Sequence, residues 1–320
     1  MDDQLAGWVE RIELARSRIY ALVEQTPLIE VEDHKPAFST AQLFLKMEHL
    51  QKTGSFKLRG AANKILSLSA AAAGKGVVTS STGNHGLGVA AAAQQRGIDA
   101  EVYVSSQVSS KKLSMMQGYG ARIQHGGRSP LEAEIAARKA ADDSGRTYIS
   151  PYNDPEVIAG QGTIATELLQ QSSHIGAIYI AVGGGGLIGG VGAYLKSASR
   201  RTNVVACWPE TSRAMYECLR AGRIVDVPEQ PTLSESTAGG VEPGSVTFEL
   251  CQKVIDHTVL VTEEQILDAM RWAHRKGWMI EGAAAVAIAA YWKEAGRHHN
   301  EAVVIVSCGG NASPEVLSRL

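Results

Sequence analysis

The chain has 320 residues, of which 31 are Lys or Arg and 33 are Asp or Glu, so its formal net charge is −2. This length predicts about two domains with a substantial core, and the balanced charge argues against a protein that binds nucleic acid or an acidic membrane surface. The four cysteines fit neither a metal site nor a disulfide scaffold, and neither a leader sequence nor a run of about 18 apolar residues occurs. We therefore expect a cytoplasmic protein with reduced thiols and without a signal peptide or membrane span.

Short runs rich in β-branched residues alternate with longer alanine-rich segments along most of the chain. The predicted strands are residues 43–47, 77–80, 100–104, 122–125, 178–182, 204–208 and 303–306. The predicted helices are residues 60–73, 87–95, 130–143, 158–171 and 263–276. Strands that alternate with helices in this way are typical of an α/β protein with parallel sheets, and the near-continuously apolar strands indicate sheets covered on both faces.

Two segments rich in turn-forming residues interrupt this alternation. Residues 51–55 read Gln-Lys-Thr-Gly-Ser, and residues 150–155 read Ser-Pro-Tyr-Asn-Asp-Pro. Two crossings between lobes at these places predict a small domain of residues 51–150 that is inserted in a large domain. The large domain would then consist of residues 1–50 and 151–320.

A lysine lies just before the first predicted helix in an unusual setting. Residues 55–60 read Ser-Phe-Lys-Leu-Arg-Gly. A single lysine is normally solvated, but the neighbouring Phe56 and Leu58 favour a desolvated amine with a lowered pKa. Such an amine can form a Schiff base with a carbonyl compound.

A second polar segment follows the predicted strand 77–80 and precedes an alanine-rich helix. Residues 81–86 read Ser-Thr-Gly-Asn-His-Gly. Hydroxyls, an amide and free backbone N–H groups at a helix N-terminus suit a carboxylate ligand, although an ordinary helix cap needs only one of these residues. The segment therefore indicates either a cap or a carboxylate site.

Four consecutive glycines, residues 183–186, follow the apolar strand 178–182 and begin a helix. Without Cβ atoms, successive backbone N–H groups can converge on a phosphate at the positive end of the helix. The spacing of Gly184, Gly186 and Gly189 also fits the dinucleotide fingerprint, with Glu210 at the distance of a ribose-binding acid. The loop predicts an anion cradle, and the spacing alone leaves a nicotinamide dinucleotide open.

The last predicted strand ends in residues 307–311, Ser-Cys-Gly-Gly-Asn. Ligands of open α/β sheets bind beyond the carboxyl ends of the strands, so this loop should join the two glycine-rich loops there. Cys308 could equally be a buried thiol that packs as a small apolar group.

Taken together and in this order, segments 55–61, 81–86, 183–186 and 307–311 resemble the serine/threonine dehydratase and serine racemase family of fold-type II pyridoxal-phosphate enzymes. The resemblance extends to residues 26–28 and 159–163 and so spans nearly the whole chain. It implies an α/β fold of the tryptophan synthase β type, with two lobes that each hold a mostly parallel sheet flanked by helices. It also implies pyridoxal phosphate as the cofactor and a homodimer or higher homo-oligomer.

The resemblance assigns residues to the site, with Lys57 as the Schiff-base lysine and catalytic base. The cofactor-binding residues that it implies are Phe56 beside the pyridine ring, Lys57, Asn84 on the phenolic oxygen, Gly183, Gly184, Gly185, Gly186 and Leu187 around the phosphate, Glu281 near the far side of the cofactor, and Cys308 at the pyridine nitrogen. The substrate-binding residues that it implies are Ser81, Thr82, Asn84 and His85.

The implied reaction is β-elimination from a β-hydroxy-α-amino acid such as L-threonine or L-serine, which yields a 2-oxo acid and ammonia. A thiol is a weak donor, so Cys308 would leave the pyridine nitrogen largely unprotonated, which favours elimination. Racemases of the family carry a serine where this chain has Thr82, whose methyl group restricts its rotamers. Racemisation therefore stays open as a second reaction.

The sequence also leaves a different substrate and two different classes of protein open. Residues 230–233 and 281–284 resemble dehydratases of hydroxyectoine breakdown, which act on a hydroxylated diaminobutyrate derivative. An NAD-dependent oxidoreductase and a catalytically silent amino-acid-binding module are the candidates from different classes. We expect a small amino acid as ligand, and neither nucleic acid nor membrane as a partner.

A bound metal ion is not expected. Some members of the family hold a divalent cation after the strand that corresponds to residues 204–208, where this chain offers Trp208, Ser212 and Ala214. A shift of two residues would bring in Glu210, but Tyr216 supplies no second carboxylate, and hard cations need several oxygen ligands. The chain also ends about ten residues after Asn311, which predicts no regulatory extension of the biosynthetic type.

Overall fold

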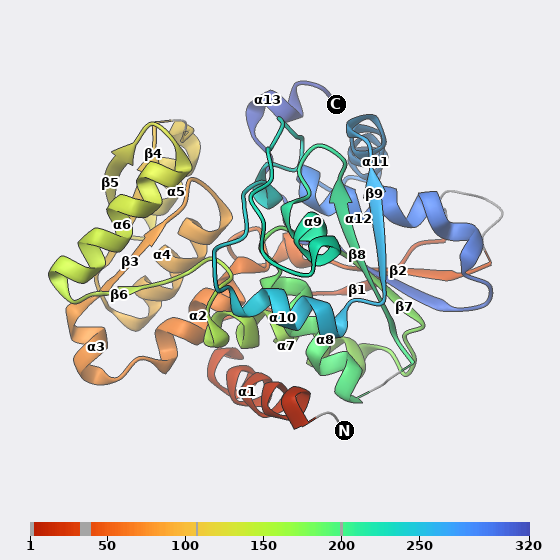
Figure 1. The fold of residues 1–320 in the computed structure, drawn as a ribbon, viewed down its shortest axis with the longest axis horizontal. Helices are drawn as coiled ribbons and strands as arrows, with labels where there is room; N and C mark the ends of the chain where they lie inside the picture. The colour runs from red at the N-terminus through yellow and green to blue at the C-terminus, as the bar shows by residue number, and fades with distance from the viewer. Residues whose placement is uncertain (1–2, 33–39, 107, 199–200) are drawn as a thin grey trace.

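Two separate β-sheets organise the molecule (Figure 1). The computed structural model describes residues 3–32, 40–106, 108–198 and 201–320. The six-stranded sheet has the order β1 (Leu28–Glu30), β2 (Gln42–Lys46), β10 (Ala302–Val306), β7 (Ala177–Ala181), β8 (Asn203–Pro209) and β9 (His257–Val261). The four-stranded sheet has the order β5 (Arg122–Gly127), β4 (Ala100–Ser105), β3 (Val77–Ser80) and β6 (Thr147–Tyr148). Every pairing is parallel except that of β1 with β2.

Helices flank both sheets, and α2, α7 and α8 lie between them at the centre of Figure 1. The helices are α1 (Asp3–Ile19), α2 (Lys57–Ser67), α3 (Ala70–Lys75), α4 (Asn84–Arg96), α5 (Ser110–Gly118), α6 (Pro130–Ser144), α7 (Pro155–Gln171), α8 (Gly186–Ala198), α9 (Ala214–Ala221), α10 (Val246–Val254), α11 (Glu263–Arg275), α12 (Gly282–Glu294) and α13 (Pro314–Leu317). Short 3₁₀ turns are η1 (Glu48–Leu50), η2 (Glu235–Thr237) and η3 (Ala295–Arg297). Each helix that follows a parallel strand starts at the carboxyl end of that strand, where ligands bind in such sheets.

All seven predicted strands are confirmed with small shifts at their ends. The sequence pattern missed β1, β6 and β9, of which β1 and β6 are too short to show an alternation. It also missed α12, because this helix is apolar on all sides and buried against the six-stranded sheet. The extent of the two domains, 51–150 and the remainder, stays a prediction.

The predicted single helix 60–73 is wrong, since the chain forms two helices there. Leu68 adopts an extended conformation with ψ of 142°, which ends α2. Ser69 then caps α3, because its side chain accepts the N–H of Ala72. A serine within an alanine-rich run offers the backbone an alternative hydrogen bond, which makes it a helix start rather than a helix interior.

Close backbone contacts hold the central helices together. A Cβ on Gly160 of α7 would lie 2.5 Å from the carbonyl oxygen of Arg59 in α2. A Cβ on Gly190 of α8 would lie 2.3 Å from the carbonyl oxygen of Ile158 in α7. Because only glycine permits such approaches, these contacts determine where the N-termini of α2 and α8 lie relative to each other.

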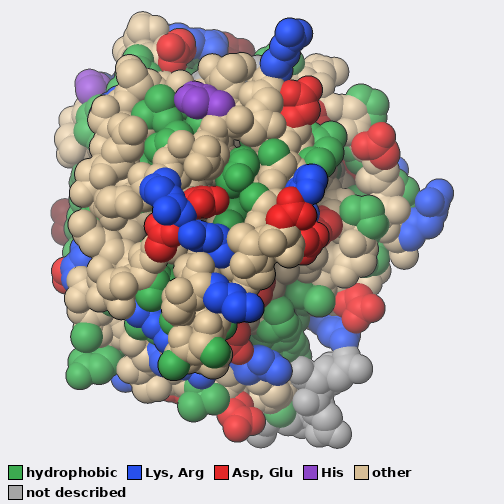
Figure 2. Space-filling view, turned by 90° about the vertical axis from the view of Figure 1, so that its left-hand side faces the viewer, with side chains coloured by type: hydrophobic (Ala, Val, Ile, Leu, Met, Phe, Trp, Pro, Cys, Tyr) green, Lys and Arg blue, Asp and Glu red, His purple; other side chains and the backbone are tan. Residues whose placement is uncertain are grey.

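On the side of the four-stranded sheet, the surface carries Lys and Arg side chains intermingled with Asp and Glu (Figure 2). This mixture agrees with the small formal net charge of −2. Within the described ranges, none of the helices combines the length and the apolar composition needed to cross a membrane.

The contact between α2 and α7 gives a direct test. We expect Gly160→Ala to lower the free energy of unfolding by about 1–3 kcal/mol, because the added methyl group meets backbone that cannot move aside cheaply. Gly7→Ala is the matched control, since Gly7 is an exposed residue of α1 and nothing lies within 4 Å of its added methyl group. Equal denaturation curves for the Gly160→Ala variant and the unmodified protein would contradict the close packing.

Candidate active site

A pocket lies where the carboxyl ends of strands from both sheets meet. Its lining comes from the starts of α2, α4 and α12, the connection between β6 and α7, the turn between β7 and α8, η2 and the loop after β10. The lining residues are Phe56, Lys57, Asn84, Tyr152, Ala181, Val182, Gly183, Gly184, Gly185, Gly186, Leu187, Ile188, Ser236, Thr237, Ala283 and Cys308. The structure thus brings together most of the predicted cofactor-binding residues.

Lys57 is the first residue of α2, and its amine lies inside the pocket. The Nζ atom donates a hydrogen bond to the carbonyl oxygen of Pro151 at 2.8 Å and lies 5.1 Å from the centroid of the Phe56 ring. Burial of the amine lowers the pKa of Lys57 to about 8, although the nearby Cys308 and Glu281 act in the opposite direction. At pH 7 roughly a tenth of such amines are neutral, far more than for an ordinary lysine.

The start of α2 is attached to the loop after β10. The N–H of Phe56 donates to the carbonyl oxygen of Cys308 at 3.1 Å, and Ser55 forms an isolated bridge with Gly309. Ser55 is fully buried and its hydroxyl finds no partner among the described residues. The backbone just before Lys57 is therefore tied to the loop that follows β10 of the six-stranded sheet.

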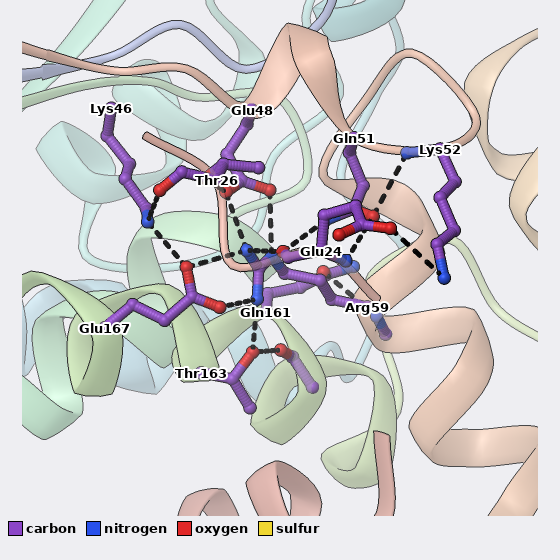
Figure 3. Close-up of polar contacts among 12 residues, drawn as sticks. Glu24, Thr26, Lys46, Glu48, Gln51, Lys52, Arg59, Gln161, Thr163 and Glu167 are labelled. Carbon is purple, nitrogen blue, oxygen red and sulfur yellow. Dashed lines mark hydrogen bonds and ion pairs between the residues drawn. The ribbon is translucent and has the colours of Figure 1, made fainter. Parts of the chain in front are cut away.

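Arg59, two residues after Lys57, lies at the centre of a buried ion-pair cluster (Figure 3). Its guanidinium donates to both carboxylate oxygens of Glu48 at 2.8 Å and to those of Glu167 at 2.6 and 3.0 Å. Lys46 completes the cluster by donating to Glu167 at 2.5 Å, so two positive and two negative charges balance. Burial raises the pKa of Glu48, but the charges of Arg59 and Lys46 and the hydrogen bonds from Arg59 and Thr26 together outweigh it, so the pKa is lowered overall. The cluster connects the first turn of α2 to η1 and α7.

The glycine turn has backbone N–H groups without partners. Within the described part of the chain, no acceptor lies within hydrogen-bond reach of the N–H groups of Gly183, Gly184 and Gly185. Gly185 has a φ of +87°, a conformation that favours glycine. The turn is also tightly packed, because a Cβ on Gly184 would lie 2.4 Å from the ring of Tyr152 and one on Gly185 would lie 2.7 Å from Cys251 Sγ. Free N–H groups at the start of α8 suit an anion.

Asn84 begins α4 and is fixed by its neighbours. Its Nδ2 atom donates to both carboxylate oxygens of Glu281 at 3.0 and 2.9 Å, and its Oδ1 accepts a hydrogen bond from Asn311 at 2.7 Å. Glu281 also accepts from the hydroxyl of Ser236 at 2.7 Å. Glu281 does not line the pocket itself, but its carboxylate holds the Asn84 side chain, which does.

Cys308 presents a neutral thiol to the pocket. Burial, with the negative charge of Glu281 as a second cause, raises the pKa of Cys308 well above its ordinary value. A neutral thiol is a weak hydrogen-bond donor and a weak acceptor.

Three of the predicted substrate-binding residues do not line the pocket: Ser81, Thr82 and His85. The Ser81 hydroxyl accepts the N–H of Gly83 at 3.1 Å, which stabilises the turn before α4. His85 is buried, and its Nε2 atom lies 3.0 Å from the carbonyl oxygen of Ile149. Burial and the charge of Lys57 lower the pKa of His85 to about 3, so the ring is neutral. Its Nδ1 atom is buried and has no hydrogen-bond partner among the described residues.

The sequence pattern did not identify Ser236 and Thr237, which line the pocket from η2. They lie in a segment, residues 234–240, that contains only small or polar side chains and reads as an ordinary loop. The turn-forming composition was the available signal, but it does not reveal which strand end the loop approaches.

The residues considered as ligands for a cation do not form a cation site. Trp208 packs edge-on against Tyr216 with ring centroids 5.6 Å apart, and Glu210 is exposed. Among the described residues, no group of three or more His, Cys, Asp or Glu side chains is arranged to hold a metal ion.

A lysine amine with a lowered pKa, opposite a glycine turn at a helix N-terminus and between two parallel sheets, defines an enzyme that uses a phosphorylated carbonyl compound as its cofactor. Residues 19–309 match the family described as "Pyridoxal-phosphate dependent enzyme". The chain belongs to this family, and pyridoxal phosphate is its cofactor. The residues present fit that group, because the pocket offers a nucleophilic amine and unpartnered N–H groups.

Individual relatives agree with this assignment. The chain is 39% identical to an L-threonine ammonia-lyase of Thermotoga maritima over 280 residues. This alignment covers 87% of this chain and 69% of that protein. The processed form of threonine deaminase isoform 2 from Solanum lycopersicum has a TM-score of 0.94 at 32% identity, covering 100% of this chain and 93% of that one. Maize serine racemase has a TM-score of 0.87 at 29% identity, and the match covers 97% of this chain and 95% of the racemase chain. The predicted fold-type II class and cofactor are confirmed, and the nicotinamide alternative is wrong.

The lowered pKa of Lys57 can be measured without any assumption about its role. In competitive acylation of the cofactor-free protein across pH, we expect the labelling of Lys57 to reach half its maximum near pH 8. Lys139 is the internal control, because its ion pair with Asp143 raises its pKa. A Lys57 profile that coincides with that of Lys139 would show that the amine is not desolvated.

Proposed function

We propose that this protein is an L-threonine or L-serine ammonia-lyase, which eliminates the β-hydroxyl group of its substrate and releases a 2-oxo acid and ammonia. The observation that carries the proposal is the meeting of the Lys57 amine, the glycine turn and the Cys308 thiol in one pocket. The names of its relatives as L-threonine ammonia-lyase and threonine deaminase support the substrate class.

When bound, pyridoxal phosphate supplies an electron-accepting ring that stabilises negative charge at Cα of the amino acid. We assign its carbonyl attachment to Lys57 and its phosphate to the N–H groups of Gly183–Gly186 and Leu187. Phe56 and Asn84 would contact the ring, with Cys308 near its nitrogen and Glu281 holding Asn84 in place.

Once the substrate amine has displaced Lys57, the neutral Lys57 amine is the base for the Cα proton. Its lowered pKa keeps a useful neutral fraction near pH 7. The resulting Lys57 ammonium can return that proton to the departing β-hydroxyl, which leaves as water. The enamine would be released when the Lys57 amine re-forms its attachment to the carbonyl carbon of the cofactor. Its imine tautomer would then take up one water molecule and give the 2-oxo acid and ammonia, so the water consumed equals the water lost in elimination.

We place the substrate carboxylate at the start of α4, on the segment of Ser81, Thr82, Asn84 and His85. The N–H groups of a helix N-terminus attract an anion, and the Lys112 Nζ atom would lie 3.9 Å from a Cβ on Gly83. Neutral His85 adds no charge to this region.

The smaller domain of residues 51–150, assembly into a homodimer or higher oligomer, and a cytoplasmic location remain predictions from the sequence. A hydroxylated diaminobutyrate derivative is the alternative substrate. Racemisation is the alternative reaction, because Thr82 supplies a hydroxyl group and related structures include serine racemase.

The decisive experiment measures products from L-threonine and L-serine in deuterated water. We expect 2-oxo acid and ammonia in equal amounts, with elimination at least about tenfold faster than formation of the D-enantiomer, since a barrier difference of ~1.4 kcal/mol is sufficient. Formation of D-product as fast as 2-oxo acid would replace the lyase by a racemase. Turnover of neither substrate would leave the diaminobutyrate derivative to be tested.

Lys57→Ala should abolish turnover, because it removes both the carbonyl attachment and the base. Lys64→Ala on the same helix is the matched control, since Lys64 pairs with Asp154 outside the pocket. Borohydride reduction followed by peptide mapping should place the cofactor on Lys57 in the unmodified protein. Cofactor found on another lysine would refute the assignment.

Gly185→Ala should weaken cofactor binding by about tenfold or more, because the added methyl group meets Cys251 and the φ of +87° becomes strained. Gly97→Ala is the control: Gly97 also has a positive φ, of +71°, but nothing lies within 4 Å of its added Cβ. The dissociation constant is read from the visible absorption of the bound cofactor. Equal constants for the two variants would move the phosphate away from this turn.

A further inference from the structure

The loop between η2 and α10 makes three hydrogen bonds through one residue, Glu242. Its backbone N–H donates to the hydroxyl of Tyr152 at 2.9 Å. Its Oε2 atom accepts from Asn153 Nδ2 at 2.8 Å, and its Oε1 atom accepts from Arg138 at 2.8 Å. The three partners lie on two different segments, so Glu242 is a junction.

Two of these partners belong to the connection between β6 and α7. The ring of Tyr152 forms part of the pocket wall and packs directly on Gly184. Asn153 is held at both ends, since its Oδ1 atom accepts the N–H of Val246 at 3.0 Å. The backbone and side chain of Glu242 therefore determine where the Tyr152 ring lies over the glycine turn.

The third partner comes from the second sheet. Arg138 lies on α6, which packs against the four-stranded sheet, and its guanidinium lies 4.4 Å from the centroid of the Tyr148 ring. It also pairs with Glu134 within α6. The ion pair of Arg138 with Glu242 thus connects the four-stranded sheet to a loop of the six-stranded sheet.

We propose that Glu242 is a positioning residue that couples the placement of α6 to the Tyr152 wall of the pocket. When Arg138 holds the carboxylate, the Glu242 N–H donates to the Tyr152 hydroxyl and the Tyr152 ring packs on Gly184. When the ion pair is absent, the loop is free to carry Tyr152 away from the glycine turn. This inference rests on the proposed function for its kinetic test only.

The exposure of the Arg138 and Glu242 side chains sets the expected effect of breaking their ion pair. The side chains of Arg138 and Glu242 are 38% and 28% exposed, so their ion pair is screened by salt and contributes modestly. We expect its loss to raise KM for L-threonine by about two- to fivefold while kcat changes less than about twofold. The cost falls on substrate binding because neither Arg138 nor Glu242 forms a hydrogen bond with Lys57.

The test uses the cofactor-loaded enzyme and four single variants. Arg138→Met and Glu242→Gln each break the ion pair, and Tyr152→Phe removes the hydroxyl acceptor. Lys139→Met is the matched control, because it removes a cation from the neighbouring position of α6, where Lys139 forms an exposed ion pair with Asp143. The double variant Arg138→Met/Glu242→Gln completes a mutant cycle.

Arg138→Met and Glu242→Gln should raise KM equally, and the double variant should raise it no further. Added NaCl should raise the KM of the unmodified enzyme towards that of Arg138→Met, with little effect on the variant. Additive effects, or an Arg138→Met variant whose KM equals that of Lys139→Met, would overturn the proposal.

A readout independent of turnover is hydrogen exchange of the Glu242 amide. Its exchange should be faster in Arg138→Met and in Tyr152→Phe than in the unmodified protein, and unchanged in Lys139→Met, with or without cofactor. Unchanged exchange in Arg138→Met would show that α6 does not influence the wall. If the enzyme does not act on L-threonine at all, the proposed function fails, and the exchange rates alone decide the role of Glu242.

Discussion

The pairing of the Arg59 guanidinium with two buried carboxylates is the interaction on which the site depends. Burying a charged group away from water is energetically costly, and removing one partner of a buried ion pair typically destabilises a protein by about 3–5 kcal/mol. Here Glu48 and Glu167 occupy both edges of the guanidinium fork, and Lys46 balances the remaining charge. Because Arg59 lies two residues from Lys57, the cost of disturbing the cluster also opposes any rotation of the first turn of α2.

The pocket is built from helix starts. The N-termini of α2, α4 and α8 reach it and contribute the Lys57 amine, the Asn84 side chain and the glycine turn. Three positive helix ends near one cavity favour an anionic ligand without placing more than one lysine amine in the lining. This arrangement requires that the helices approach closely, which is why Gly160 and Gly190 are needed far from the chemistry.

Most of the site could be predicted because its parts are local in sequence. A strand, a polar or glycine-rich turn and a helix start occupy consecutive residues, so the segments around Lys57, Asn84 and Gly184 could be recognised one at a time. Ser236 and Thr237 could not be assigned in this way, since their place in the lining depends on how a loop folds back over strand ends. The helix break at Ser69 was missed because alanine-rich sequence on both sides hides a single capping residue.

The opposite pKa shifts of Lys57 and Cys308 have a consequence for chemoselectivity. Burial favours the neutral form of both groups, but the neutral form of an amine is its nucleophilic form, whereas a thiol reacts as the thiolate. Two groups that could compete for one carbonyl carbon are therefore placed in the same pocket with only one of them active near neutral pH. Burial of both groups thus directs an aldehyde to nitrogen rather than to sulfur, and no separate residue is required to protect the thiol.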